Sequence, residues 1–212
     1  NEKLFVNDSV PYIVGYEFSG IIENIGDDVT QFRVGDEVYG LRSIMIQDET
    51  EKKRTPYGTL AEYCVFDECE IASKPENITH EEACAVPFAA LTAIQIFEAA
   101  RFKFNNFKKV LILGGEDGFG NMALQIAKEL YGATHIAIAV PSTYDTVLSH
   151  NIPLTNRNPY VQILDSDKDL ERMKEIRKFD LVVDFMGKAD WLMNLNIIHQ
   201  GGVCISTAAP PC

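Results

Sequence analysis

The sequence lacks any apolar run long enough to cross a bilayer. Spanning one takes about 20 consecutive apolar residues, and polar residues interrupt every apolar stretch of the 212-residue chain before that length. Basic residues are also scarce, because 19 Lys and Arg stand against 31 Asp and Glu, giving a formal charge of −12. Such a charge repels nucleic acid and anionic membrane surfaces. We therefore predict no transmembrane segment and no nucleic-acid partner.

The cysteines lack the spacing of a metal or disulfide framework. There are five of them, with no Cys-x-x-Cys pair and no His spaced to complete a metal cage. We predict reduced thiols and no metal site. Ser206 and Thr207 also have no partner His at a recognisable spacing, which argues against nucleophilic hydrolysis.

Two regions of the chain differ in their apolar pattern. Residues 12–65 contain short β-like runs, FSGIIENI, EVYGL and LAEYCVF, separated by turn signals, and this predicts a meandering antiparallel region. From residue 109 onward, the apolar runs VLIL, HIAIAV, VQIL, LVVDF and VCIS alternate with helical stretches. That alternation predicts a five-stranded parallel sheet with helices on both faces. We place the two domains at residues 1–85 and 86–212.

Helices are expected at four places. Thr79 and Glu82 form a capping box before EEACAVPFAALTAIQIFEAA, a helical stretch that Pro87 must interrupt or kink. In the second region, helices are predicted over MALQIAKEL, over DLERMKEI and around Trp191.

The most informative local feature is LILGGEDGFGNMALQIAK, a strand, a glycine-rich turn and a helix. In such a turn, free N–H groups at the helix N-terminus bind a pyrophosphate, and glycines let the backbone approach it. The strict Gly-x-Gly-x-x-Gly pattern would read Gly115, Asp117 and Gly120, so an aspartate replaces the middle glycine.

That aspartate leaves two interpretations open. A carboxylate about 4 Å from a phosphate repels it by roughly 4 kcal/mol at an effective dielectric near 20. Asp is also a good N-cap, so the Asp117 side chain could satisfy the N–H groups that a phosphate would otherwise use. The turn is therefore either a working dinucleotide site or a capped, empty one.

The end of the second parallel strand bears on the choice of cofactor. A site that prefers NAD places an acidic residue there, against the ribose hydroxyls. This sequence has Ser142 and Thr143 instead, followed by Asp145. Hydroxyls are more compatible with the 2′-phosphate of NADPH, but no Arg or Lys lies adjacent to clamp it. An ordinary polar turn accounts for the segment equally well.

Longer segments resemble a known superfamily. PYIVGYEFSGIIENIGDDVTQFRVGDEVYG resembles the catalytic-domain signature of medium-chain dehydrogenases/reductases, and GTLAEYCVFDECEIASKPENITHEEACAVPFAALTA resembles the segment joining that domain to the Rossmann domain. KPENITHEEACAVPFAALTA, KKVLILGG and KFDLVVDFMG are most similar to the zeta-crystallin-like quinone oxidoreductases, particularly the mitochondrial reticulon-interacting ones. The resemblance implies an α/β chain with a partial GroES-like β domain and a Rossmann-type doubly wound parallel sheet. The family's opening strands and everything after its fifth Rossmann strand have no counterpart, so we expect a fold truncated at both ends.

The resemblance also implies an activity. Zinc alcohol dehydrogenases carry a zinc-binding His in a Gly-x-Glu motif that reads Gly15-Tyr16-Glu17 here, and their four-cysteine lobe has no counterpart. This implies hydride transfer without zinc from NADPH, with NADH less favoured, to a quinone or an activated enone; no catalytic residue is identified. The resemblance implies a homodimer or a subunit of a larger assembly, in mitochondria or otherwise in the cytoplasm. A competing hypothesis is a non-catalytic family member, a structural or assembly subunit whose cofactor site Asp117 blocks.

Cofactor-binding positions follow from the resemblance, one residue at a time. They are Gly114, Gly115, Gly118, Phe119 and Gly120 in the phosphate turn, Ser142 and Thr143 at the adenosine ribose, and Thr92, Met186, Gly187 and Thr207 around the nicotinamide. Two of these have equally good structural explanations, since Thr92 could bond within its helix and Met186 could pack in the core.

Overall fold

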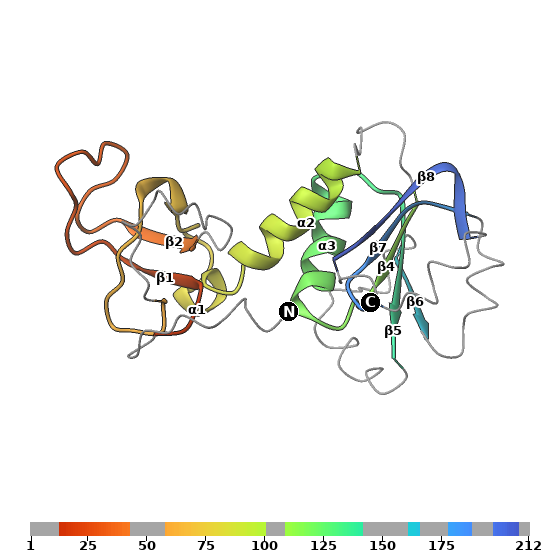
Figure 1. The fold of residues 1–212 in the computed structure, drawn as a ribbon, viewed down its shortest axis with the longest axis horizontal. Helices are drawn as coiled ribbons and strands as arrows, with labels where there is room; N and C mark the ends of the chain where they lie inside the picture. Colours follow the sequence, from red (N-terminus) through yellow and green to blue (C-terminus); the bar gives the residue numbers. More distant parts are fainter. Residues whose placement is uncertain are drawn as a thin grey trace, which may run out of the picture. The chain divides into compact units, whose positions relative to one another are not determined.

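The computed structural model describes residues 13–42, 58–100, 109–141, 161–165, 178–187 and 197–207. Its contacts divide the chain into two compact units, Asn1–Phe88 and Ala89–Cys212. This division lies three residues beyond the domain boundary predicted from the sequence. Figure 1 shows the helices and strands of both units.

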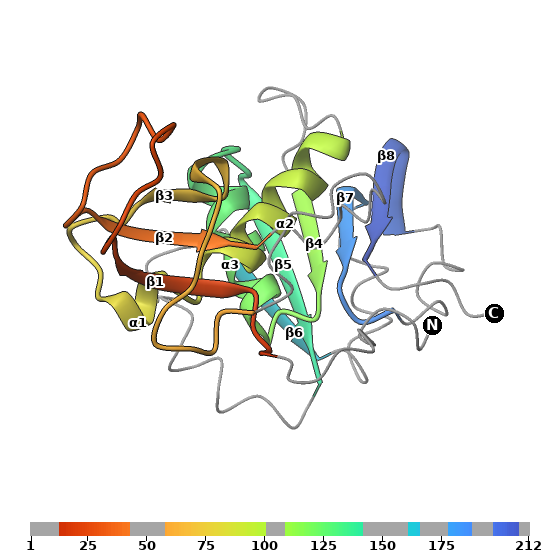
Figure 2. The ribbon, with the colours of Figure 1, turned by 60° about the vertical axis from the view of Figure 1, so that its left-hand side comes forward.

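The first unit contains an antiparallel sheet with the strand order β1-β2-β3 (Figure 2). β1 spans Glu17–Ile21, β2 spans Glu37–Leu41 and β3 spans Ile71–Ser73. β1 overlaps the first β-like run, starting one residue before it, and β2 coincides with the second; both neighbouring pairs are antiparallel as predicted.

The third β-like run, LAEYCVF at residues 60–66, is not a strand. Its first residue bonds to a distant segment, because the Leu60 N–H donates to the Val14 carbonyl at 2.9 Å, and its last residue packs through an aromatic side chain. The Phe66 ring stacks on Phe18 with 4.3 Å between centroids, and the Arg42 guanidinium lies 4.3 Å from the centre of the same ring. Tyr63 and Val65, by contrast, are 76% and 70% exposed. No second sheet face buries these alternate residues, so the apolar alternation was misleading here.

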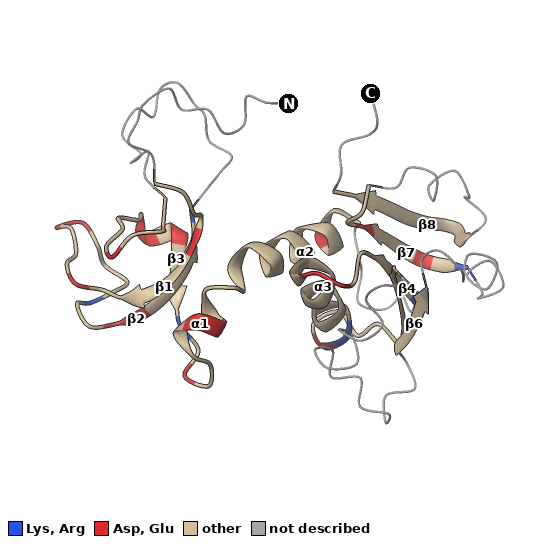
Figure 3. Cartoon of the chain, turned by 90° about the horizontal axis from the view of Figure 1, so that it is seen from below, with Lys and Arg blue, Asp and Glu red and all other residues tan. Residues whose placement is uncertain are grey.

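α1, which spans His80–Ala83, begins at the predicted capping box. The Thr79 hydroxyl accepts a hydrogen bond from the Glu82 N–H at 3.2 Å, and the Glu82 carboxylate accepts one from the Thr79 N–H at 2.9 Å. Glu81 and Glu82 occupy the first turn, where acidic side chains interact favourably with the helix dipole (Figure 3). α2 then spans Pro87–Ala99. Pro87 therefore starts a second helix, at a position where its missing N–H removes no helical hydrogen bond.

Taken together, His80–Ala99 is long and apolar enough to cross a membrane, with 20 residues and a mean hydropathy of 1.3. This is the one such candidate in the described part of the chain, and it qualifies the prediction that the chain has no transmembrane segment. The stretch is divided between two helices, and α2 packs Ala93, Ile96 and Phe97 into a protein core. A core helix passes the same test of length and composition, so the stretch is weak support for a membrane span.

The second unit contains five parallel strands in the order β6-β5-β4-β7-β8 (Figures 1 and 2). Each strand coincides with one of the predicted apolar runs. The bounds are Lys109–Leu113 for β4, His135–Val140 for β5, Val161–Asp165 for β6, Phe179–Asp184 for β7 and Ile198–Ser206 for β8. A sheet whose first strand lies in the middle is a doubly wound sheet of the Rossmann type, which confirms the predicted fold.

The central strand β4 is buried on both faces. Val110 and Ile112 belong to one core cluster together with α2 and α3, which spans Gly118–Glu129. Leu111 and Leu113 belong to a second cluster on the opposite face. All four side chains are at most 1% exposed, which explains why the strand is apolar at every position after Lys109. The helices predicted over DLERMKEI and around Trp191 lie outside the described residues.

Candidate functional site

The candidate site lies where β4 and β7 end, side by side. From β4 the chain continues through α3 to β5, which pairs with one edge of β4. The later strand β7 pairs with the other edge of β4. This divergence is the topological switch point, outside which ligands of open α/β sheets bind. Both turns are anchored to neighbouring strands, because Gly114 N–H donates to the Ala139 carbonyl at 3.1 Å and Phe185 N–H donates to the Leu113 carbonyl at 3.0 Å.

Three glycines of the turn after β4 are required by the structure. Gly114 has a φ of +86°, and a Cβ there would lie 3.0 Å from the Met186 side chain. A Cβ on Gly115 would overlap the Ile138 side chain. A Cβ on Gly120 would overlap the carbonyl oxygen of Gly114 and the Cα of Gly115. The absence of side chains therefore lets α3 approach the turn closely enough to form a narrow backbone cradle.

Asp117 occupies the N-cap position of α3. Its backbone is extended, with φ −103° and ψ 179°, and its Oδ1 accepts a hydrogen bond from the Gly120 N–H at 2.9 Å. The predicted N-cap interaction is therefore present. It uses one backbone donor, whereas the N–H of Gly118 has no acceptor among the described residues. The helix start is thus partly capped.

Glu116 adds a second carboxylate to the same turn. Its Oε2 atom is buried and has no hydrogen-bond partner within the described residues. An unpaired buried oxygen of this kind is unfavourable unless another group compensates for its lost hydration.

Aromatic side chains connect the two turns. The rings of Phe119, in the first turn of α3, and Phe185, directly after β7, stack with 5.7 Å between centroids and 26° between their planes. The start of α3 and the end of β7 therefore pack against each other through these rings.

Asp184, the last residue of β7, was missed by the sequence reasoning. Its side chain is 0% exposed. One carboxylate oxygen accepts the N–H groups of Met186 and Gly187 at 2.8 and 3.0 Å, and the other accepts the Ser206 hydroxyl at 3.1 Å. A signal was available, because an acidic residue within the apolar run LVVDF requires buried hydrogen-bond partners.

The end of β8 is tied to the same residue. Thr207 N–H donates to the Asp184 carbonyl at 3.0 Å, and the Thr207 hydroxyl lies 3.5 Å from that oxygen. Burial raises the pKa of the Cys204 thiol to about 11, and the negative charge of Asp184 adds to the effect. Cys204 is therefore a protonated packing residue at neutral pH, not a reactive thiol.

The structure brings most of the predicted positions to this edge of the sheet. Thr92 is half-buried in α2, and no described contact links it to the turns after β4, β7 and β8. Ser142 and Thr143 lie outside the described residues. Eight of the predicted positions lie at the switch point or at the ends of the strands beside it: Gly114, Gly115, Gly118, Phe119, Gly120, Met186, Gly187 and Thr207.

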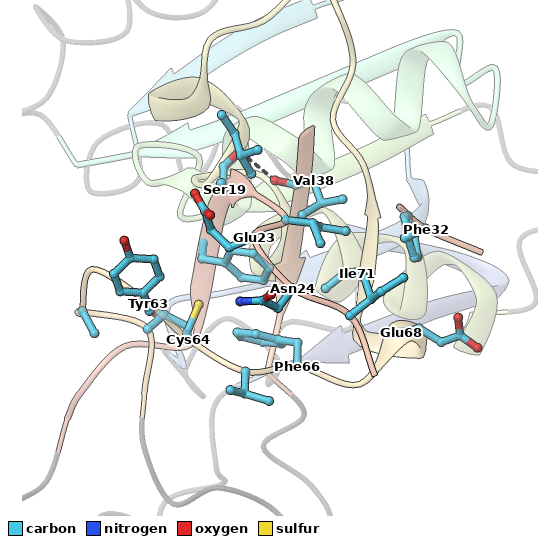
Figure 4. A pocket seen from close by; sticks show the side chains of 18 of the residues that line it. Ser19, Glu23, Asn24, Phe32, Val38, Tyr63, Cys64, Phe66, Glu68 and Ile71 are labelled. Carbon is cyan, nitrogen blue, oxygen red and sulfur yellow. Dashed lines mark hydrogen bonds between the residues drawn. The ribbon is translucent and has the colours of Figure 1, made fainter. Parts of the chain in front are cut away.

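A separate cavity of about 1020 Å³ lies in the first unit (Figure 4). Its lining includes the aromatic rings of Tyr63 and Phe66, and Ser19, whose hydroxyl donates to the Val38 carbonyl at 3.1 Å. Carboxylates also line it, but no Lys or Arg does among the described residues. No residue at the start of an α-helix lines this cavity within the described part of the chain, whereas α3 begins at the switch point, so the switch point is the better candidate for a nucleotide.

The fold and the glycine cradle define a Rossmann-type α/β unit that follows an antiparallel β unit in the sequence. Comparison with known proteins agrees with this class, since the alcohol dehydrogenase GroES-like domain matches residues 2–76. A 2-methylene-furan-3-one reductase of Solanum lycopersicum is 32% identical over 205 residues, which cover 95% of this chain and 49% of that protein. The NAD(P)H oxidoreductase RTN4IP1, mitochondrial, of Danio rerio is 30% identical over 213 residues, which cover 94% of this chain and 49% of that protein.

Solved structures show the same fold. The quinone oxidoreductase from Coxiella burnetii superposes with a TM-score of 0.71 at 24% identity, covering 94% of this chain and 56% of that one. These similarities confirm the predicted resemblance to the medium-chain dehydrogenase/reductase superfamily. It spans about half the length of these curated relatives.

Proposed function

We propose that the chain is the central part of an NADPH-dependent reductase that transfers hydride to a quinone or an activated enone. The observation that carries this proposal is the glycine cradle at the switch point. Gly114, Gly115 and Gly120 are buried and lack side chains, so α3 begins directly against the end of β4, where a dinucleotide pyrophosphate binds in doubly wound sheets. The names of the relatives support a nicotinamide cofactor and a reductive reaction.

The chain's own residues would hold and orient such a cofactor. The N–H of Gly118 and the positive end of the α3 dipole would interact with the pyrophosphate. Met186, Gly187 and Thr207, at the ends of β7 and β8, would face the nicotinamide. The dinucleotide supplies the hydride when it is bound, and the protein supplies alignment and exclusion of water.

Zinc independence is part of the proposal and rests on Tyr16, which occupies the position of the zinc-binding His. The neighbouring carboxylate has a structural partner, because Glu17 Oε1 accepts the Phe88 N–H at 2.7 Å. A reaction without a Lewis acid requires an acceptor that is already electrophilic, which is why we propose quinones and enones. Assaying the metal-free full-length protein with a quinone and with an enone tests this, and a requirement for added zinc would contradict it.

We propose NADPH as the cofactor in preference to NADH because β5 is followed, after Pro141, by the hydroxyl residues Ser142 and Thr143 and not directly by a carboxylate. We also propose a mitochondrial location, as in the name of the Danio rerio relative, and a homodimer or larger assembly. Subcellular fractionation and sedimentation of the native protein test these two points.

Asp117 favours the second candidate function, a non-catalytic subunit of an assembly. Its bond to Gly120 uses a donor that a pyrophosphate would otherwise engage. The buried, unpaired Glu116 oxygen adds further negative charge to the turn. In this alternative the carboxylates replace the phosphate, and the cradle serves only the packing of α3.

Titration of the full-length protein with NADPH and NADH, followed by nucleotide fluorescence, separates the two candidates. The variants are Asp117→Gly, which removes both cap and charge, and Asp117→Ser, which removes the charge but keeps an N-cap side chain. Micromolar binding of NADPH by the native protein supports the reductase. Absence of binding until Asp117 is replaced supports the non-catalytic subunit, and rescue by Gly but not by Ser would identify the cap, not the charge, as the block.

A further inference from the structure

One buried carboxylate connects the ends of two strands at the switch point. Among the residues that the structure describes, Asp184 is the one charged residue that is buried as a whole, backbone and side chain together, at 0% exposure. It accepts three hydrogen bonds, from Met186 N–H, Gly187 N–H and the Ser206 hydroxyl, at 2.8, 3.0 and 3.1 Å. Its own carbonyl accepts the Thr207 N–H at 3.0 Å. The Asp184 side chain therefore joins the turn after β7 to the end of β8, in addition to the backbone pairing of the two strands.

The phosphate turn is held by different contacts. Gly114 N–H donates to Ala139, and Asp117 caps the N–H of Gly120. None of these hydrogen bonds involves the Asp184 side chain, and the two turns meet instead through the stacked Phe119 and Phe185 rings and the Phe185 N–H bond to the Leu113 carbonyl. The two ends of a dinucleotide would thus be supported by separate sets of hydrogen bonds.

We propose that Asp184 is a positioning residue for the nicotinamide end of the cofactor. This inference rests on the proposed function, in which Met186, Gly187 and Thr207 face the nicotinamide. The carboxylate acts through these residues and does not touch the cofactor. Because hydrogen bonds to a buried charged group are stronger than neutral ones, their loss allows both strand ends to shift.

The test compares two ligands on the full-length protein. NADPH contains both ends of the dinucleotide, whereas 2′-phospho-ADP-ribose contains the adenosine and pyrophosphate portions but no nicotinamide. We expect Asp184→Ala to weaken the binding of NADPH about tenfold or more, because a charged buried acceptor is lost. The affinity for 2′-phospho-ADP-ribose should stay within about twofold of the wild-type value. A general loss of folding would change both affinities together.

Three further variants sharpen the comparison. Asp184→Asn keeps an oxygen for the Met186 and Gly187 N–H groups and should restore most of the NADPH affinity. Ser206→Ala removes only one donor, so a smaller loss confined to NADPH is expected even if Asp184→Ala does not fold. The matched control is Asp180→Ala, at the opposite end of β7, where the carboxylate accepts the Lys109 N–H at 3.0 Å. It should leave the ratio of the two affinities unchanged.

The outcomes distinguish this inference from the proposed function. If wild-type protein binds NADPH but neither Asp184→Ala nor Ser206→Ala changes the affinity ratio, the positioning role is wrong and the proposed function stands. Equal weakening of both ligands also overturns the positioning role, because it shows a general effect on the fold. If wild-type protein binds neither ligand, the proposed function fails and this inference fails with it.

Discussion

Replacing Gly120 with alanine tests whether the cradle is a close-packed structural element. A Cβ on Gly120 would overlap the Gly114 carbonyl oxygen and the Gly115 Cα, and would lie 2.9 Å from the Gly115 carbonyl carbon. These are backbone atoms, so no side-chain rotation relieves the overlap and α3 must move away from the turn. Overpacking of this kind costs about 1–3 kcal/mol, and alanine in a helix recovers about 1 kcal/mol relative to glycine. We expect Gly120→Ala to lower the free energy of unfolding by about 2 kcal/mol, which is the larger overpacking cost less the gain from alanine.

Gly118, two residues earlier, is the matched control. A Cβ there meets no heavy atom within 4 Å. Gly118→Ala should therefore leave the free energy of unfolding unchanged or raise it by up to about 1 kcal/mol, through the smaller entropy of the unfolded chain. Equilibrium urea unfolding of both variants, followed by circular dichroism, gives the comparison. Equal stability of Gly120→Ala and wild type, or equal destabilisation by both substitutions, would refute the close-packing argument.

Three further predictions concern the rest of the chain. Burial raises the pKa of the Cys204 thiol to about 11, so this thiol should resist iodoacetamide at pH 8 while the exposed Cys69 is alkylated. Because the folded state holds the Cys204 proton more tightly than the unfolded state, the contribution of this thiol to stability should fall as the pH rises from about 9 to 11. Phe97→Ala, at a fully buried ring, should cost about 3–5 kcal/mol in urea unfolding. The Lys74 Nζ atom lies 3.1 Å from Glu37 Oε2 and lowers the pKa of that carboxyl, so Lys74→Met should raise the pKa of Glu37, as measured by NMR titration. Any stability that this pair provides is present above the unfolded-state pKa of Glu37 and is lost as the pH falls through its lower folded-state pKa.

The parallel sheet could be predicted from the sequence because its strands are apolar at almost every position. The runs VLIL and HIAIAV are buried on both faces, and few other structures bury such short runs completely. The N-terminus of α1 was predictable for a local reason as well. Thr79 and Glu82 satisfy each other's backbone groups within one turn, so their spacing alone identifies the helix start.

The remaining features depend on contacts between distant residues. The run at residues 60–66 alternates like a strand, yet Phe66 packs on Phe18, which lies over forty residues earlier in the chain. One of the three hydrogen bonds that the Asp184 carboxylate accepts comes from Ser206, which reaches it only through the pairing of β7 with β8. Asp117 illustrates the intermediate case. Its capping bond was predicted as one of two alternatives, and the local geometry shows that bond but does not determine whether a phosphate can replace it.

The strand order has a consequence for the order in which the site forms during folding. The β4–β5 pairing joins Lys109 to His135, whereas the β4–β7 pairing joins Val110 to Leu181, across a much longer segment of chain. Closing the longer loop costs about 1 kcal/mol more in chain entropy, so the β4–β5 pair with α3 is expected to form first. The crevice between β4 and β7 then exists only after the slower, long-range pairing is made. A ligand bound there would contact the early and the late part of the sheet together, and it would slow unfolding by holding β7 in place.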